Sequence, residues 1–210
     1  MKPETIPLLL AIGAFFLGAI PFGFIAGKLR GVDLRKVGSG NIGATNVMRE
    51  LGKGPGSIVL LLDVLKGLAP VLVARSLLLL PSWWVVGIGL CAILGHIYSP
   101  FVRFRGGKGV ATSLGVLIGL SPLIAAISFT LFVLVVFFTR YVSLGSIIGA
   151  VAQAVLFWII PPSAIPSENL PYRLFGLVAA VFVIIRHRAN IQRLLRGEEN
   201  RFGAKKSTGV

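Results

Sequence analysis

The sequence predicts an all-α fold: a polytopic membrane helix bundle of about seven transmembrane helices. First, 55% of the 210 residues are hydrophobic, and they form long runs that carry few charges. Second, the basic residues gather between and after these runs. The positive-inside effect explains that arrangement, so the net charge of +14 does not indicate a nucleic-acid partner. Third, the chain has one cysteine, Cys91, and two histidines. These are too few for a disulfide framework or a Cys/His metal cluster.

The first apolar run, at about 5–27, is too long for the apolar core of a signal peptide, so it is predicted to be the first span. Pro21 should kink it, with neighbouring groups satisfying the freed carbonyl. The basic loop at 28–56 belongs in the cytoplasm, which leaves the N-terminus outside. Within this loop we expect a short helix at about 42–51 that ends at Gly52.

The next two spans are predicted at about 57–80 and 83–99. Asp63 and Lys66 lie one turn apart in the first of them, and charged residues in a span usually face a bundle interior or water. They form a structural ion pair, or else Lys66 belongs to an anion site. His96, near the inner end of the following span, is either a hydrogen-bonded structural residue or a catalytic one.

The apolar stretch 110–138 is broken at Ser121-Pro122. Because the loop at 28–56 and the basic C-terminal tail both belong in the cytoplasm, an even number of crossings must separate them, and this stretch must supply two passes or a re-entrant pair. Its first arm, 110–120, is only about 16 Å long, against a bilayer core of about 30 Å. We expect a short or broken helix here, lining a cavity.

Two more spans are predicted at about 142–160 and 172–185. A basic amphipathic helix should follow from Arg186, and residues 203–210 look disordered. The C-terminus is then cytoplasmic. No internal repeat is visible, and we expect residues 1–210 to form a single integral membrane domain.

Three polar clusters fall on the same, inner face in this topology: 38–49, 106–113 and 187–199. The first is rich in glycine, which lets backbone N–H groups approach a ligand. It adds amide and hydroxyl donors and a guanidinium fork suited to phosphate or carboxylate. Its candidate ligands for an anion are Ser39, Gly40, Asn41, Thr45, Asn46 and Arg49.

The second cluster puts two glycines before Lys108 and a helix start after it, a combination that favours phosphate binding. It is not a Walker A loop, because Lys108 is followed by Gly109. Its candidate residues are Gly106, Gly107, Lys108, Gly109 and Thr112.

In the third cluster, His187, Asn190 and Arg193 are spaced three apart on one helical face. His187 could act as a base or hydrogen-bond a hydroxyl group. Ser143 and Ser146, at the inner end of the span 142–160, are second-line contacts together with Lys66. Each cluster alone could be a lipid-headgroup contact or plain positive-inside charge. Lipid anchoring needs charge, however, and does not call for the glycines and uncharged amides of 38–49.

These motifs resemble those of the bacterial acyl-phosphate-dependent glycerol-3-phosphate acyltransferases. The resemblance lies in 39–49, 106–112, and 187–194 with Gly197-Glu198-Glu199, and it extends over nearly the whole chain. It implies transfer of a fatty acyl group from acyl phosphate to the 1-hydroxyl of sn-glycerol 3-phosphate, giving lysophosphatidic acid and phosphate in phospholipid biosynthesis. It also implies a multi-pass protein of the bacterial inner membrane with its active site on the cytoplasmic face.

The sequence lacks the motif of acyltransferases that use other acyl donors. The His-x4-Asp pair of acyl-CoA and acyl-carrier acyltransferases is absent, because Phe101 follows His96 by five residues and Gln192 follows His187 by five. Acyl phosphate is an activated mixed anhydride, so we expect direct attack by the glycerol hydroxyl, with no cofactor, metal or protein partner. The rival hypothesis, a transporter for a phosphorylated or carboxylated solute, would place its polar groups near the midplane and would favour paired repeats.

Roles follow for four residues. Lys108 would hold one phosphate and stabilise the developing oxyanion, and Arg49 would hold another phosphate. His187 is the best protein base, with Asn190 orienting the substrate, unless the leaving phosphate takes the proton and leaves His187 a positioning role.

Overall fold

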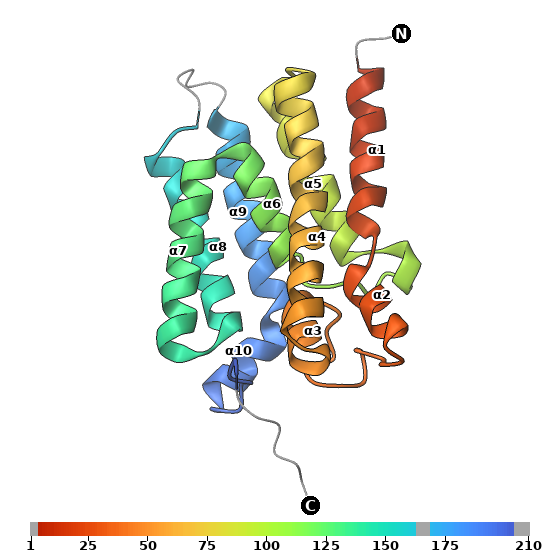
Figure 1. Ribbon diagram of the computed structural model, residues 1–210. Coiled ribbons are helices and arrows are strands. Elements are labelled where there is room, and N and C mark those ends of the chain that lie inside the picture. The colour runs from red at the N-terminus through yellow and green to blue at the C-terminus, as the bar shows by residue number, and fades with distance from the viewer. Residues whose placement is uncertain (1–3, 163–168, 204–210) are drawn as a thin grey trace, which may run out of the picture.

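The computed structural model describes residues 4–162 and 169–203. These residues form helices joined by loops and turns, with no strand among them (Figure 1). The α-helices are α1 (Thr5–Ala19), α2 (Phe22–Leu29), α3 (Ala44–Leu51), α4 (Lys53–Leu72), α5 (Ser82–Ile97), α6 (Val110–Leu120), α7 (Pro122–Thr139), α8 (Val142–Ile159), α9 (Asn169–Arg186) and α10 (Arg188–Leu195). A π-helix, η1 (Val73–Leu77), continues α4, and a 3-10 turn, η2 (Pro100–Val102), follows α5.

Six helical segments in the described part of the chain are long and apolar enough to cross a membrane, and α6 is a shorter apolar helix of 11 residues. The prediction of about seven membrane helices, one of them short, is confirmed. The start of α1 and the end of α10 lie at opposite ends of the bundle, as an odd number of passes requires (Figure 1). Of the tail predicted to be disordered, 203–210, all but Gly203 lies outside the described residues.

The first span is broken rather than only kinked. α1 ends at Ala19 and α2 begins at Phe22, with Pro21 between them. The carbonyl of Ile20 accepts a hydrogen bond from Nζ of Lys66 at 2.8 Å, and the carbonyl of Ala19 accepts one from Oγ of Ser99 at 2.5 Å. Side chains of neighbouring helices therefore satisfy the freed backbone groups, as predicted.

The core is centred where α4, α5, α6 and α9 meet, and it buries Ile88, Val116 and Phe175 completely. α4 and α6 lie in backbone contact: a Cβ atom at Gly67 would lie 2.2 Å from the carbonyl oxygen of Thr112. Small residues allow such close approach of membrane helices. Figure 1 shows α6 starting partway along the bundle, so the loop before it enters the protein interior.

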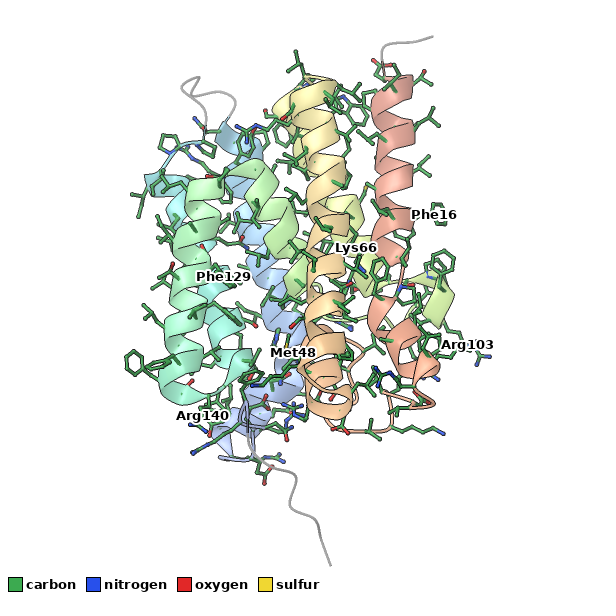
Figure 2. The ribbon with its side chains drawn as sticks, in the orientation of Figure 1. Phe16, Met48, Lys66, Arg103, Phe129 and Arg140 are labelled. Atoms are coloured by element: carbon green, nitrogen blue, oxygen red, sulfur yellow. The ribbon has the colours of Figure 1, made fainter. Side chains whose placement is uncertain are left out.

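After α10 the chain folds back toward the α7–α8 turn. The backbone N–H of Phe202 donates to the carbonyl of Arg140 at 2.7 Å, and the Arg201 guanidinium lies 5.5 Å from the ring centre of Tyr141. Figure 2 shows Arg140 at this end of the bundle, beside α10. The residues after α10 are thus fixed against two spans that precede them in sequence.

Candidate active site

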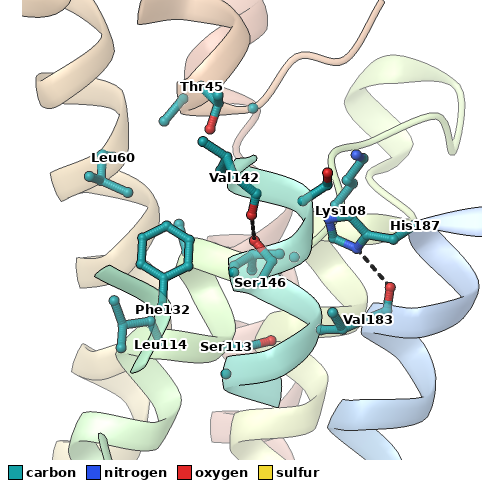
Figure 3. A pocket seen from close by; sticks show the side chains of 18 of the residues that line it. Thr45, Leu60, Lys108, Ser113, Leu114, Phe132, Val142, Ser146, Val183 and His187 are labelled. Carbon is teal, nitrogen blue, oxygen red and sulfur yellow. Dashed lines mark hydrogen bonds between the residues drawn. The ribbon is translucent and has the colours of Figure 1, made fainter. Parts of the chain in front are cut away.

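A pocket of about 460 Å³ brings together parts of all three predicted polar clusters. The pocket lies between α3, α4, α6, α7, α8 and the α9–α10 junction. Its volume is in the range common for sites that bind small molecules. Figure 3 shows Lys108 and His187 at one side of the pocket. Phe132 lies at the other side, where the lining is apolar.

The side chain of Asn46 organises the loop before α3. Its Oδ1 accepts a hydrogen bond from the backbone N–H of Ser39 at 2.9 Å, and its Nδ2 donates to the carbonyls of Leu34 and Val37 at 3.1 Å each. With its amide occupied in this way, Asn46 shapes the loop. Arg49, one turn further along α3, lines the pocket and has no hydrogen-bond or ion-pair partner among the described residues.

The loop at 106–109 requires glycine because it passes directly over His96. A Cβ atom at Gly106 would lie 2.0 Å from the His96 carbonyl oxygen, and one at Gly107 would lie 2.2 Å from Nε2 of the same residue. On the other side, Nη2 of Arg186 donates to the carbonyl of Gly107 at 3.1 Å. Gly109, with φ of +83°, then turns the chain into α6.

Lys108 projects from this loop into the pocket (Figure 3). Burial lowers its pKa to about 8, and the neighbouring charge of Arg193 acts in the same direction while that of Glu199 opposes it. Its Nζ donates to Oδ1 of Asn190 at 2.5 Å. A bound anion would strongly stabilise the charged form of a lysine that is desolvated to this degree.

His187 presents a neutral imidazole to the pocket. Its side chain is buried, and Nδ1 lies 2.8 Å from the carbonyl of Val183 (Figure 3). A carbonyl only accepts, so Nδ1 carries the proton and Nε2 is left with a lone pair. Burial, followed by the charge of Lys108, lowers the pKa of His187 to about 4. Nε2 has no partner among the described residues, so it is available to accept a hydrogen bond from a ligand hydroxyl group.

Glu199 joins the C-terminal segment to the pocket. One carboxylate oxygen, Oε1, accepts from Oγ of Ser143 at 2.9 Å and from Nδ2 of Asn190 at 2.6 Å. The other, Oε2, accepts from Nε of Arg193 at 2.8 Å. Glu199 lies in the third motif and was not among the predicted site residues. Glu198 and Glu199 are adjacent carboxylates in the basic tail, and the sequence does not distinguish between them.

The remainder of the pocket is mostly apolar and extends between α4 and α7. Leu60 and Val64 of α4 line one wall, Leu114 and Leu117 of α6 form its back, and Phe129 and Phe132 of α7 line the opposite wall. Leu60 and Phe129 are 39% and 46% exposed, so the apolar part can be reached from the side of the bundle. This shape suits a hydrocarbon chain attached to a polar head.

Most of the predicted site residues line this pocket. They are Ser39, Asn41, Thr45, Asn46, Arg49, Lys108, Gly109, Ser143, Ser146, His187 and Asn190. Others support it from behind: Gly106 and Gly107 form the loop that carries Lys108, Arg193 binds Glu199, and Gly40, with φ of +70°, makes a turn. Ser146 donates to the Val142 carbonyl within its own helix (Figure 3).

Two predicted contacts lie elsewhere. Lys66 does not line the pocket; it pairs with Asp63 at 2.7 Å and binds the Ile20 carbonyl at the break in the first span. Helix rotation turns its ammonium group away from the polar end of the pocket. Thr112 is fully buried and its Oγ1 lies 3.2 Å from Nδ1 of His96. Of the two alternatives for Lys66, the geometry favours the structural ion pair.

Comparisons with known proteins agree with one another. The sequence model of the family described as glycerol-3-phosphate acyltransferase matches residues 8–197. A glycerol-3-phosphate acyltransferase of Geobacter sulfurreducens is 50% identical over 198 residues, which cover 94% of this chain and 98% of that protein. One of Synechococcus elongatus is 45% identical over 207 residues, covering 95% and 96%.

Two solved structures are similar to this one. Both are crystal structures of PlsY (YgiH), an integral membrane glycerol 3-phosphate acyltransferase. The glycerol 3-phosphate form has a TM-score of 0.88 and 44% sequence identity, and the lysophosphatidic acid form has a TM-score of 0.85 and 42% identity. In both cases the match covers 94% of this chain and 96% of the other.

Proposed function

The chain belongs to the glycerol-3-phosphate acyltransferase family, and we propose that its acyl donor is acyl phosphate and its products are lysophosphatidic acid and phosphate. The protein is an integral membrane acyltransferase. The transporter considered above loses its support, because the similar proteins of known function are enzymes. The related PlsY structures, one in a glycerol 3-phosphate form and one in a lysophosphatidic acid form, support the proposed acceptor and product.

One observation carries the proposal: a polar end with two cationic side chains and a neutral imidazole continues into an apolar groove. Lys108 and Arg49 would each face one phosphate, which matches a reaction in which both substrates are phosphorylated. The groove between α4 and α7 would take the hydrocarbon chain of the donor.

The reaction needs no covalent enzyme intermediate. The 1-hydroxyl oxygen of glycerol 3-phosphate forms a bond to the acyl carbonyl carbon, and the bond from that carbon to the phosphate oxygen breaks. Lys108 and the backbone N–H groups that follow Gly106 would stabilise the oxyanion or the departing phosphate, while the shared pocket supplies orientation. The groups that bind the substrates are thus also the groups that lower the barrier.

The hydroxyl proton has two possible acceptors, and the electrostatics favour one of them. An imidazole with a pKa of about 4 is a weaker base than a phosphate group, whose second pKa is about 6. We infer that Nε2 of His187 accepts a hydrogen bond and orients the hydroxyl, with Asn190 nearby, and that substrate phosphate receives the proton. His187→Asn, which keeps a polar group there, should then retain more activity than His187→Leu.

The test is acyl transfer by the purified protein in lipid nanodiscs. Glycerol 3-phosphate would be supplied with an acyl phosphate or, in parallel, with the matching acyl-CoA, and lysophosphatidic acid would be measured by mass spectrometry. We expect product from acyl phosphate and none from acyl-CoA, without added metal or partner protein. Product formed with acyl-CoA and not with acyl phosphate would overturn the proposed donor. Absence of product with both donors would overturn the proposed acceptor.

The basic loop at 28–56 and the basic tail support a cytoplasmic site in a bacterial inner membrane, with the N-terminus outside. Reporter fusions at the two ends test this orientation. A fused alkaline phosphatase should be active only at the N-terminus, and a fused fluorescent protein should fold only at the C-terminus. The reverse pattern would place the pocket on the outer side.

A further inference from the structure

A set of buried polar residues lies beside the pocket and is not used by the reaction as described: Asp63, Lys66, His96 and Thr112, called here the interior network. Asp63 and Lys66 are 2% and 3% exposed and their charged atoms are 2.7 Å apart. Lys66 extends the network to the break between α1 and α2 through the Ile20 carbonyl. Burying two charges is unfavourable unless they are paired, and a pair seldom stabilises a fold more than apolar residues would.

His96 connects this network to the 106–109 loop. Nδ1 lies 3.2 Å from Oγ1 of Thr112 and 3.6 Å from Oδ1 of Asp63. The opposite edge of the ring lies directly against Gly107, where an added Cβ would be 2.2 Å from Nε2. The backbone of His96 and Ile97 contacts the same loop, since the N–H of Gly106 donates to the Ile97 carbonyl at 3.1 Å. Each edge of the imidazole therefore has its own neighbour.

We propose that His96, which lies within hydrogen-bond distance of Thr112 and next to Asp63, is a positioning residue that fixes the position of the 106–109 loop and thereby the place of a bound phosphate. This rests on the proposed function, in which that loop and Lys108 hold a phosphate group. Arg186 holds the loop carbonyls from one side and His96 supports the loop from the other. The loop N–H groups are thus fixed in position before a substrate arrives.

The charges of the network fit this role. Asp63 and His96 both line the pocket, whereas Lys66 does not. An unpaired carboxylate beside a phosphate site would repel the substrate. Lys66 neutralises that carboxylate from behind, so Asp63 can orient the histidine without adding net negative charge to the site. A purely structural filler at position 96 would need neither the carboxylate nor the lysine.

The test compares His96→Leu, which fills the space, with His96→Gln, whose amide can again form a hydrogen bond with Oγ1 of Thr112. Misplacement by about 1 Å can lower a rate by roughly a hundredfold, so for His96→Leu we expect the KM of one phosphate substrate to rise about tenfold or more. The KM of the other substrate should change less than about twofold, and His96→Gln should recover most of the loss. Unchanged KM values in His96→Leu, or no recovery in His96→Gln, would overturn the proposal.

Arg75→Gln is the matched structural control. Nη1 of Arg75 donates to the Gly119 and Leu120 carbonyls at the far end of α6, at 2.9 and 2.7 Å. It should lower the melting temperature and leave both KM values unchanged. If His96→Leu does not fold, Thr112→Val removes one contact of Nδ1 with little change in volume, and it should raise the same KM about threefold. No rise in Thr112→Val would count against the proposal.

A binding measurement separates failure of this inference from failure of the proposed function. Inorganic phosphate should raise the melting temperature of the wild-type protein whatever its acyl donor is. His96→Leu should weaken that stabilisation about tenfold in phosphate concentration, and Arg75→Gln should not. Phosphate stabilisation that is equal in wild type and His96→Leu would reject His96 as a positioning residue, even if the acyl transfer reaction is as proposed.

Discussion

Two lysines, the buried Lys66 and the half-buried Lys108, mark two regions of this molecule that differ in how their polar groups are satisfied. Lys66, in the interior network, pairs with a carboxylate and a backbone carbonyl and faces no open space. Lys108 lines the pocket, where it binds the neutral amide of Asn190, and burial lowers its pKa to about 8. The lysine of the interior network has a charged partner, whereas the pocket leaves a cation and an imidazole nitrogen without one.

The difference indicates where a ligand would add most. A group whose charge is already neutralised gains little from a substrate, while a desolvated cation near Arg49 and Arg193 gains a great deal from phosphate. Unfilled polar capacity, rather than burial or residue type, distinguishes the candidate active site from the network beside it.

The largest effect is expected from Lys108→Ala, which removes the cation from the pocket. It should lower kcat/KM by roughly 10²- to 10³-fold, as the loss of one donor to a developing oxyanion does. The melting temperature should hold or rise, because an incompletely paired buried charge is removed. Activity in nanodiscs and thermal unfolding would be measured on the same preparation.

Lys66→Met is expected to lower stability, in contrast to Lys108→Ala. It leaves Asp63 buried without its partner, which costs about 3–5 kcal/mol in the free energy of unfolding. We expect a lower melting temperature, with Asp63→Asn added to Lys66→Met restoring part of it. A stable but inactive Lys66→Met protein, or an unstable Lys108→Ala protein, would reverse the contrast between the two lysines.

The next effect concerns the loop between the two regions. Gly107→Ala should lower kcat/KM by roughly ten- to a hundredfold, because the added methyl group would overlap Nε2 of His96 and displace the loop. Gly13→Ala is the control, since a Cβ there meets nothing within 4 Å. Kinetics for both substrates would show the loss, and equal activity of the two variants would argue that the loop can move freely.

A smaller effect should appear in the pH dependence of kcat/KM, which reports the free enzyme. Lys108 binds phosphate as a cation, and its pKa of about 8 means that the charged fraction falls from about 90% at pH 7 to about 10% at pH 9. Activity should therefore decline about ninefold over that range. Lys108→Arg, which stays charged, should remove this alkaline decline even if its maximum rate is lower.

The lowered pKa of Lys108 also affects stability, which should rise with pH whereas activity falls. Because the folded pKa of Lys108 lies below the ordinary lysine value of 10.5, the unfolded chain holds that proton more tightly. The residue thus destabilises the fold below pH 8, and this penalty disappears as the pH rises toward 10.5. The difference in melting temperature between wild type and Lys108→Met should shrink over that interval.

The smallest effect is expected in the apolar groove. Phe132→Ala enlarges the wall formed by α7 and should raise kcat/KM for longer acyl donors relative to shorter ones by several-fold, since one buried methylene group is worth about 0.8 kcal/mol. Competition between two acyl phosphates in one reaction would measure the ratio. An unchanged ratio would place the hydrocarbon chain outside the space between α4 and α7.

The sequence predicted what depends on neighbouring positions along the chain. Apolar runs predicted the spans and the short α6, and Pro21 predicted a kink where the structure has a break. The spacing of His187 and Asn190 predicted that both would serve one site. The structure has both at the start of α10, where each lines the pocket.

What could not be predicted depends on helix rotation and on contacts between distant segments. The sequence left open whether Lys66 serves the anion site, and only the packing of α4 turns it toward the break between α1 and α2. Asn46 and Arg193 are polar residues in motifs, yet their hydrogen bonds hold the loop before α3 and the side chain of Glu199. Glu199 itself becomes recognisable only when the chain folds back against Ser143.

The sideways opening between Leu60 and Phe129 has a consequence for how this enzyme must be assayed. An acyl substrate that enters there is drawn from the surrounding lipid, so its effective concentration is a mole fraction in a two-dimensional phase and not a bulk molarity. Diluting the donor with inert lipid at constant total volume should slow the reaction, and adding buffer should not. Apparent KM values for the donor should therefore scale with the amount of lipid or detergent, whereas those for the water-soluble acceptor should not.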